Sequence, residues 1–78
     1  MRALLQRCSR ARVLVDGEVV GTIGAGLVAL VGTTHGDGAE QARFLARKTA
    51  NLRIFPEGAV GTGSSVLDTA GAVLVVSQ

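Results

Sequence analysis

The dipeptide Asp16-Gly17 constrains this chain more than any other short feature, because it lies between two runs rich in β-branched residues. The sequence VLV at 13–15 precedes it and EVVG at 18–21 follows it. Asp-Gly readily adopts the positive φ angles that a two-residue type I′ turn requires. The sequence therefore predicts a β-hairpin, with one long strand or two over Ala3–Val15 and an antiparallel partner over Glu18–Ile23.

A central strand is predicted directly after the hairpin. Glycines at 24 and 26 interrupt the chain, and the next segment, Leu27–Gly32, is apolar at both alternating sets of positions. A strand of this kind is typical of the middle of a sheet, where both faces are covered. Three further strands are predicted nearer the end of the chain, at Arg53–Phe55, Ser65–Asp68 and Ala72–Gln78, with a loop at Pro56–Ser64 that we expect to be the most mobile segment.

One helix is predicted between these two groups of strands. Asp37 stands three residues before Glu40, a spacing typical of helix starts, so we expect Asp37 to cap a helix over about Ala39–Ala50. Asn51 is a suitable residue to close it. Small and apolar residues recur at helical spacing and define one face: Ala42, Leu45, Ala46, Thr49 and Ala50.

These elements predict an α/β fold in the order β-β-β-α-β-β-β, with one helix packed on a small, mostly antiparallel sheet and a single domain over residues 1–78. A chain of 78 residues buries only about 60% of the surface that its unfolded form exposes. Its aromatic residues are Phe44 and Phe55, so the core must be built mainly from aliphatic side chains. We expect a thin margin of stability, which dimerisation or additional chain would raise.

The charge distribution and the single cysteine indicate which kind of partner and which cellular compartment fit this chain. The net charge is +2, and the basic residues at 2, 7, 10 and 12 all precede the first acidic residue, Asp16. This imbalance fits an anionic partner such as RNA phosphate, or simply a solvated strand face. Cys8 is the single cysteine, which excludes an intrachain disulfide. With no signal-peptide pattern and no apolar run long enough to span a membrane, we expect a reducing, cytoplasmic setting and no membrane partner.

Two glycine-rich stretches resemble nucleotide motifs. GAGLVA at 24–29 matches a dinucleotide fingerprint in letters, but that motif needs a following helix whose N-terminus faces the pyrophosphate. Here a strand of Leu and Val follows, so we interpret the stretch as a turn. GTGSS at 61–65 lacks the lysine of a phosphate loop. We therefore predict no nucleotide cofactor.

The catalytic residue types form no complete constellation. Cys8 and His35 could be a nucleophile and its base, but no third residue orients them, and Cys8 falls in an apolar strand where a free cysteine usually packs as a small hydrophobe. Asp68 and Glu57 could be an acid–base pair, yet both lie in turn or loop sequence. One histidine and one cysteine also argue against a metal site.

The ordered set of short motifs along the chain nevertheless resembles the N-terminal half of the D-aminoacyl-tRNA deacylase family, also called D-tyrosyl-tRNA deacylases. The resemblance rests on ALLQR at 3–7, V-DGEVVG-IG-GL over 15–27, LVG at 30–32, RIF at 53–55, SVLD at 65–68 and VLVVSQ at 73–78. It extends over the whole chain. Ser77 and Gln78 match the first two positions of the family's Ser-Gln-x-Thr motif, so we expect an incomplete deacylase domain whose sequence stops inside that motif.

The resemblance implies a reaction and partners. The family hydrolyses the ester between a D-amino acid, or mischarged glycine, and the 3′ adenosine of tRNA, and it acts as a homodimer without a cofactor. Backbone groups around the motif that begins at Ser77 and Gln78 hold the ester, and the terminal hydroxyl of the tRNA assists. Gln6 and Arg7 match the family's Gln-Arg pair, whose arginine supports a chirality-selecting Gly-Pro pair from the other subunit.

Two hypotheses of different classes follow. The first is a D-aminoacyl-tRNA deacylase that is catalytically incomplete over these 78 residues. The second is a non-catalytic interaction module that retains the first half of the fold and pairs through an open sheet edge.

Overall fold

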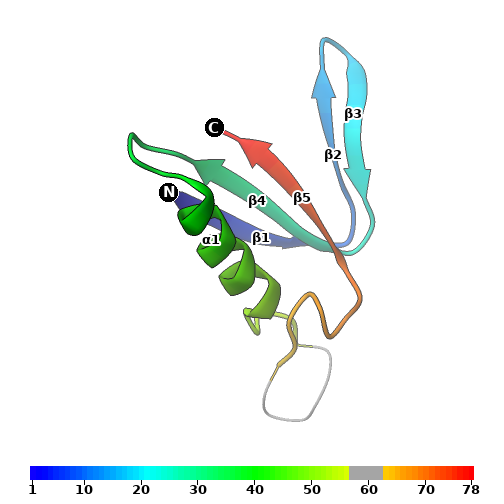
Figure 1. The fold of residues 1–78 in the computed structure, drawn as a ribbon. Coiled ribbons are helices and arrows are strands. Elements are labelled where there is room, and N and C mark those ends of the chain that lie inside the picture. Colours follow the sequence, from blue (N-terminus) through cyan, green and yellow to red (C-terminus); the bar gives the residue numbers. More distant parts are fainter. Residues whose placement is uncertain (57–62) are drawn as a thin grey trace.

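The computed structural model describes residues 1–56 and 63–78. Figure 1 shows the strands and the helix along the chain. Five strands and one helix are formed by these residues: β1 (Arg2–Cys8), β2 (Ala11–Val15), β3 (Glu18–Ile23), β4 (Gly26–Gly32), α1 (Ala39–Asn51) and β5 (Ala72–Ser77). The observed order is thus β-β-β-β-α-β, and the predicted class, one helix with mostly antiparallel strands, is confirmed.

The strands form two sheets where one was predicted. β1, β4 and β5 make a three-stranded sheet with β4 in the middle, as the apolar sequence of β4 predicts. β1 and β4 are antiparallel, from Arg2 opposite Gly32 to Cys8 opposite Gly26. β4 and β5 are parallel. Strands β2 and β3 pair only with each other, and the tip of their hairpin points away from the main sheet (Figure 1).

The hairpin turn is the one that the sequence predicts. Asp16 and Gly17 have φ angles of 50° and 82°, the left-handed values that an aspartate-glycine turn supplies at low cost. The pairing shifts by one residue between Val13 and Leu14, and such a bulge increases the local twist of a hairpin. The hairpin reaches back to β5: a Cβ on Gly21 would lie 3.0 Å from Cδ1 of Leu74. The small residue at position 21 therefore lets the hairpin approach that face of the sheet.

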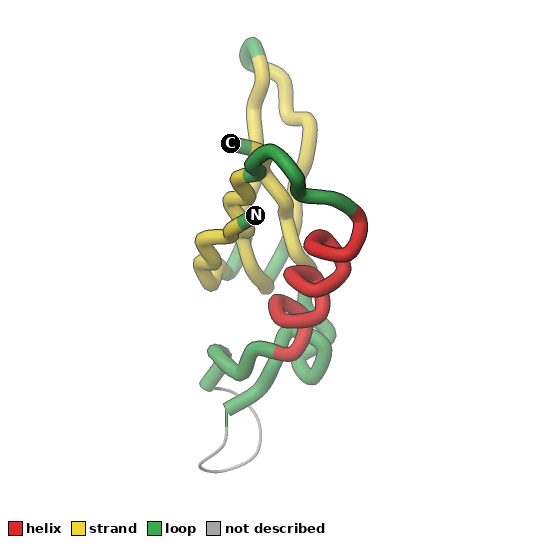
Figure 2. Tube along the Cα trace, turned by 60° about the vertical axis from the view of Figure 1, so that its left-hand side comes forward, coloured by secondary structure: helices red, strands yellow, loops and turns green. Residues whose placement is uncertain are grey.

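Helix α1 and the hairpin lie on opposite faces of β5, because Val73 and Val75 line the cleft under the helix whereas Leu74 lies against Gly21 of the hairpin. Figure 2 shows the helix in red beside the strands. The prediction that Asp37 caps this helix is wrong. Gly38 is the N-cap, and Oε1 of Gln41 accepts a hydrogen bond from the Gly38 backbone N–H at 2.8 Å. Asp37 points elsewhere, because the N-terminal ammonium of Met1 and the backbone N–H of Thr34 both donate to its carboxylate. Asn51 ends the helix, and its side chain donates to the carbonyl of Arg47 at 2.9 Å.

Two of the predicted strands do not form. Phe55 and Ser64 make only an isolated bridge, and Pro56 brings no N–H with which to extend that pairing. The SVLD segment turns instead of extending, because the Ser65 backbone N–H donates to Asp68 Oδ2 at 3.0 Å while Ser65 Oγ accepts from the Asp68 N–H at 3.2 Å. Most of the loop expected at Pro56–Ser64 falls on residues 57–62, outside the described residues.

The buried core is small. Leu27 is fully buried, and it packs with Phe55 and Val66, with Ile54 partly buried against them. Ala29 is the next buried residue of β4. The sheet residues that face α1 and the facing side of the helix are largely alanine and valine, and a cleft of about 410 Å³ remains between them. The helix is therefore held against the sheet by small side chains over a limited area.

Candidate functional site

Ser77 and Gln78 lie at the end of β5, next to the end of β4. β5 forms a strand because Ala72–Val76 is mostly β-branched, which suits a pleated, half-buried surface. Ser77 is opposite Val31 in the parallel pairing, and the backbone N–H of Gln78 donates to the Val31 carbonyl at 2.9 Å. Both residues are exposed. The alternation along the strand puts Ser77 on the same face as Val73 and Val75, which line the cleft under α1.

The structure does not bring Gln6 and Arg7 beside this pair within one chain. Gln6 is opposite Val28 and Arg7 is opposite Leu27, whereas Ser77 shares its row of the sheet with Ala3. At about 3.3 Å per residue, these rows are roughly 10 to 13 Å apart along the strands, and β4 also separates them laterally. The predicted site residues therefore occupy two separate places on the three-stranded sheet.

Arg7 borders an open hollow at its own end of the sheet. This hollow has a volume of about 1100 Å³ and is lined by the residues from Arg7 to Ser9, Gly24 to Gly26, Phe55, Ser64 and Asp68 to Ala72. Arg7 and Asp68 are its charged residues. Polar groups in an open hollow can bind a ligand, but these lining side chains do not form a pair of a nucleophile and its base.

The carboxylate of Asp68 has a structural role in the turn that replaces the expected SVLD strand. The hydrogen bond from the Ser65 backbone N–H, followed by that from its hydroxyl, lowers the pKa of Asp68, and the nearby charge of Arg53 acts in the same direction. A carboxyl group of lowered pKa is a poor general acid. Glu57, the other member of the pair that the sequence argued against, lies outside the described residues, so the structure does not test that pair.

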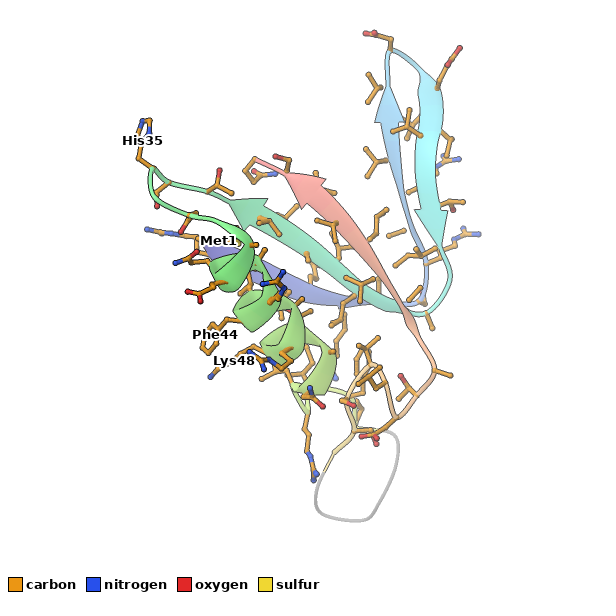
Figure 3. All side chains as sticks on the ribbon, viewed as in Figure 1. Met1, His35, Phe44 and Lys48 are labelled. Atoms are coloured by element: carbon orange, nitrogen blue, oxygen red, sulfur yellow. The ribbon has the colours of Figure 1, made fainter. Side chains whose placement is uncertain are left out.

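Cys8 and His35 do not form a dyad. Cys8 closes β1 opposite Gly26, at one end of the β1–β4 pairing, and its thiol lies 3.8 Å from the Gly24 carbonyl. His35 follows β4 at the other end, and Figure 3 shows it at the tip of that loop. A seven-residue strand separates the two ends by about 20 Å. The interpretation of Cys8 as a packing residue in a strand agrees with this geometry.

The glycine-rich stretch at 24–29 is the turn that was predicted. Gly24 and Ala25 form a bend, and β4 begins at Gly26, so no helix N-terminus is available there for a pyrophosphate. In the second stretch, Ser64 bridges to Phe55 and Ser65 holds the following turn. Neither described segment has the geometry of a phosphate loop.

Two features were missed from the sequence. The first is the ion pair between the Met1 ammonium and Asp37 at 2.7 Å, whose side chains are only 13% and 11% exposed. The ammonium bond first, and the Thr34 backbone bond second, lower the pKa of Asp37. The second is Phe44, a 57% exposed ring on α1. Its position between Arg43 and Arg47 in the helical repeat was the available signal.

Over residues 1–56 and 63–78, no helix is long and apolar enough to cross a membrane. The same part of the chain holds no group of three or more His, Cys, Asp or Glu side chains that could ligate a metal ion.

Comparison with known proteins links this geometry to one family. The family model for D-Tyr-tRNA(Tyr) deacylase matches residues 4–78. A D-aminoacyl-tRNA deacylase of Carboxydothermus hydrogenoformans is 54% identical over the whole chain, which covers 54% of that relative. Another, of Beutenbergia cavernae, is 58% identical and is covered to 52%. The chain therefore spans about half the length of the curated relatives that it matches.

A solved structure agrees with the sequence relatives. The c-Myc DNA Unwinding Element Binding Protein superposes with a TM-score of 0.89 at 39% identity, and this chain covers 53% of it. Its similarity includes every described element of the fold, since the match covers 100% of this chain. With nearly the whole sequence matched by one family model, the chain belongs to the D-Tyr-tRNA(Tyr) deacylase family.

Proposed function

We propose that these 78 residues supply the N-terminal half of a D-aminoacyl-tRNA deacylase, which hydrolyses the ester between a D-amino acid, or mischarged glycine, and the 3′ adenosine of tRNA. The observation that carries the proposal is the family match over residues 4–78, which includes Ser77 and Gln78. Each of these two residues is held in register against Val31 at the end of β5. No cofactor is required by this chemistry.

The separation of the site residues supports a site that is completed by other parts of the protein. Ser77 and Arg7 lie on different rows of the sheet, too far apart to contact one small substituent. A homodimer in the cytoplasm, with tRNA as substrate, accounts for this arrangement. In such a dimer, the second subunit can contact Arg7 of the first, while each subunit uses its own Ser77 at the ester site. Ester hydrolysis of this kind relies on donors fixed around the developing oxyanion more than on a side-chain nucleophile.

The proposal can be tested with a chimera. The segment of the Carboxydothermus hydrogenoformans relative that aligns after Gln78 is joined to this chain, and release of tyrosine from D-Tyr-tRNA and L-Tyr-tRNA is measured. We expect the chimera to hydrolyse the D-ester selectively, and the 78-residue chain alone to show no measurable turnover. A folded, dimeric chimera that hydrolyses neither ester would overturn the proposal. Equal turnover by the chain alone would show that the second half is unnecessary.

The alternative is a non-catalytic interaction module. It is favoured by the apolar surface of β5, where Val75 is 63% exposed and the strand borders the sheet. This alternative predicts that the chain binds the isolated second half of the relative in trans while the joined chimera stays inactive. Measuring both binding and turnover distinguishes the two functions.

A further inference from the structure

The outer side of α1 gathers cations around an exposed aromatic ring. At 3.6 residues per turn, Arg43, Phe44, Arg47 and Lys48 share the side opposite the small-residue face of the helix. All four are exposed, Phe44 to 57%. Figure 3 shows Phe44 and Lys48 projecting from the helix away from the strands. We call these four residues the basic helix face.

The charges of the basic helix face are not neutralised by the described part of the protein. Among residues 1–56 and 63–78, the ion pair that forms is between the Met1 ammonium and Asp37. Within this part of the chain, Arg43, Arg47 and Lys48 therefore have no acidic partner within 4.0 Å. Arg43 and Arg47 are one turn apart, a like-charge spacing that disfavours the helix. Glu40 is the acidic residue of the same side, in the first turn. Glu40 stands three residues before Arg43, a favourable spacing, whereas neither Arg47 nor Lys48 has an acidic residue three or four positions away.

The ring on this face is the more unusual feature. The sequence has two aromatic residues; Phe55 is 8% exposed in the core, whereas Phe44 is left in solvent. Lys48 Nζ lies 5.7 Å from the centroid of the Phe44 ring. Beside the ring is a shallow hollow of about 400 Å³, lined by Phe44, Arg47, Lys48, Asn51 and Leu52. The contact with Lys48 stabilises the helix only modestly at an exposed site, and more than half of the Phe44 side chain remains accessible to a partner.

We propose that the basic helix face binds single-stranded RNA, with backbone phosphates against Arg43, Arg47 and Lys48 and one unpaired base stacked on Phe44 in the hollow. Cations that follow a backbone next to an aromatic stacking surface are the combination by which proteins hold single strands. An acidic peptide would match the charges but would leave the ring without a role. The hollow is within the size range of small-ligand sites, of which about 300 Å³ is the lower end. The proposal rests on the proposed function, whose substrate is an RNA, and adds a contact surface away from Ser77.

The test uses the 78-residue chain and a fluorescein-labelled 12-nucleotide single-stranded RNA, with fluorescence anisotropy at several salt concentrations. Removing three phosphate contacts in an R43Q/R47Q/K48Q variant should reduce the slope of log affinity against log salt by about 2, at roughly 0.7 per phosphate for single strands. The matched control is R2Q/R10Q/R12Q, which removes the same charge from β1, from the connection between β1 and β2, and from β2. It should change the slope by less than half as much.

The ring is tested separately. Phe44→Ala should weaken binding by about tenfold, within the range of base stacking, and should leave the salt slope unchanged. Leu67→Ala removes a side chain of comparable exposure, 64%, and should have no effect. Circular dichroism verifies that each variant keeps its fold; Phe44→Ala is favourable for an exposed helix position.

Three results would overturn the proposal: no RNA binding by the parent chain at low salt, equal slope changes in the two triple variants, or unchanged affinity in Phe44→Ala. Polyglutamate that competes as well as RNA would identify an acidic-peptide surface instead and would also reject it. Because the RNA carries no amino acid, the result does not depend on ester hydrolysis. An inactive chimera with normal RNA binding rejects only the proposed deacylase function.

Discussion

The carbonyl oxygen of Ala72 occupies the space that a Cβ would take on Gly26. These residues begin β4 and β5 and are opposite each other in the parallel pairing. The close approach of the two backbones at this point lets β5 join the sheet, and it thereby positions Ser77 and Gln78 at the other end of the strand. A side chain at position 26 would have to displace the backbone of Ala72, which cannot move aside as a flexible side chain could.

Gly26→Ala should therefore lower the free energy of unfolding by about 3 kcal/mol, the upper part of the range for overpacking. Gly24→Ala is the matched control in the same turn, because nothing lies within 4 Å of a Cβ built there. The control should change stability by less than about 0.5 kcal/mol. Urea unfolding followed by circular dichroism measures both, and similar losses in the two variants would contradict the role assigned to Gly26.

Replacing Cys8 or His35 with Ala in the active chimera should change the deacylation rate by no more than a few-fold. The two side chains lie at opposite ends of the β1–β4 pairing, so neither can activate the other. Single-turnover hydrolysis of D-Tyr-tRNA is the measurement. A loss of about a thousandfold in either variant, the scale expected for a nucleophile or base, would restore the dyad hypothesis.

Val75→Lys should reduce self-association of the 78-residue chain. β5 borders its sheet, its residues Ala72–Ser77 include no charge or proline, and such an edge pairs readily with another strand. Val20→Lys adds the same charge at an equally exposed valine of the hairpin, since both side chains are 63% exposed. Sedimentation velocity should show fewer oligomers for Val75→Lys than for Val20→Lys. The opposite order would assign association to the hairpin.

Asp37→Asn should lower the melting temperature at neutral pH, because the carboxylate accepts bonds from the Met1 ammonium and the Thr34 backbone. These bonds lower the pKa of Asp37. A carboxyl group with a lowered folded-state pKa stabilises the protein above its unfolded value, near pH 4, and the effect is lost as the pH falls through the folded value. The difference between parent and variant should thus shrink below about pH 4.

Asp16→Asn is the control for this pH effect. It removes a carboxylate at a position with φ of 50°, which asparagine tolerates. The parent and Asp16→Asn should melt at similar temperatures at neutral pH. A stability difference for Asp37→Asn that stays constant down to pH 2 would show that the carboxylate charge is not what stabilises the contact.

Local patterns in the sequence determined the hairpin, the central strand β4 and helix α1. Asp16-Gly17 fixes its own turn, and the periodicity of Ala42, Leu45 and Thr49 fixes a helix face, because both depend on residues a few positions apart. The same local reasoning failed for Ser65–Asp68. Their strand-like composition is overridden by the reciprocal bonds between Ser65 and Asp68, which compete with an extended backbone.

Contacts between residues far apart in the chain follow from the tertiary structure. Asp37 was expected to accept a hydrogen bond from a backbone N–H of the helix, but its carboxylate instead binds the ammonium of Met1. The motifs that contain Arg7 and Ser77 could be named from the sequence, whereas their separation follows from the antiparallel and parallel registers of β4. Register is set by the packing of whole faces and by close approaches such as Gly26 to Ala72. These contacts join residues far apart in the chain, so no local pattern specifies them.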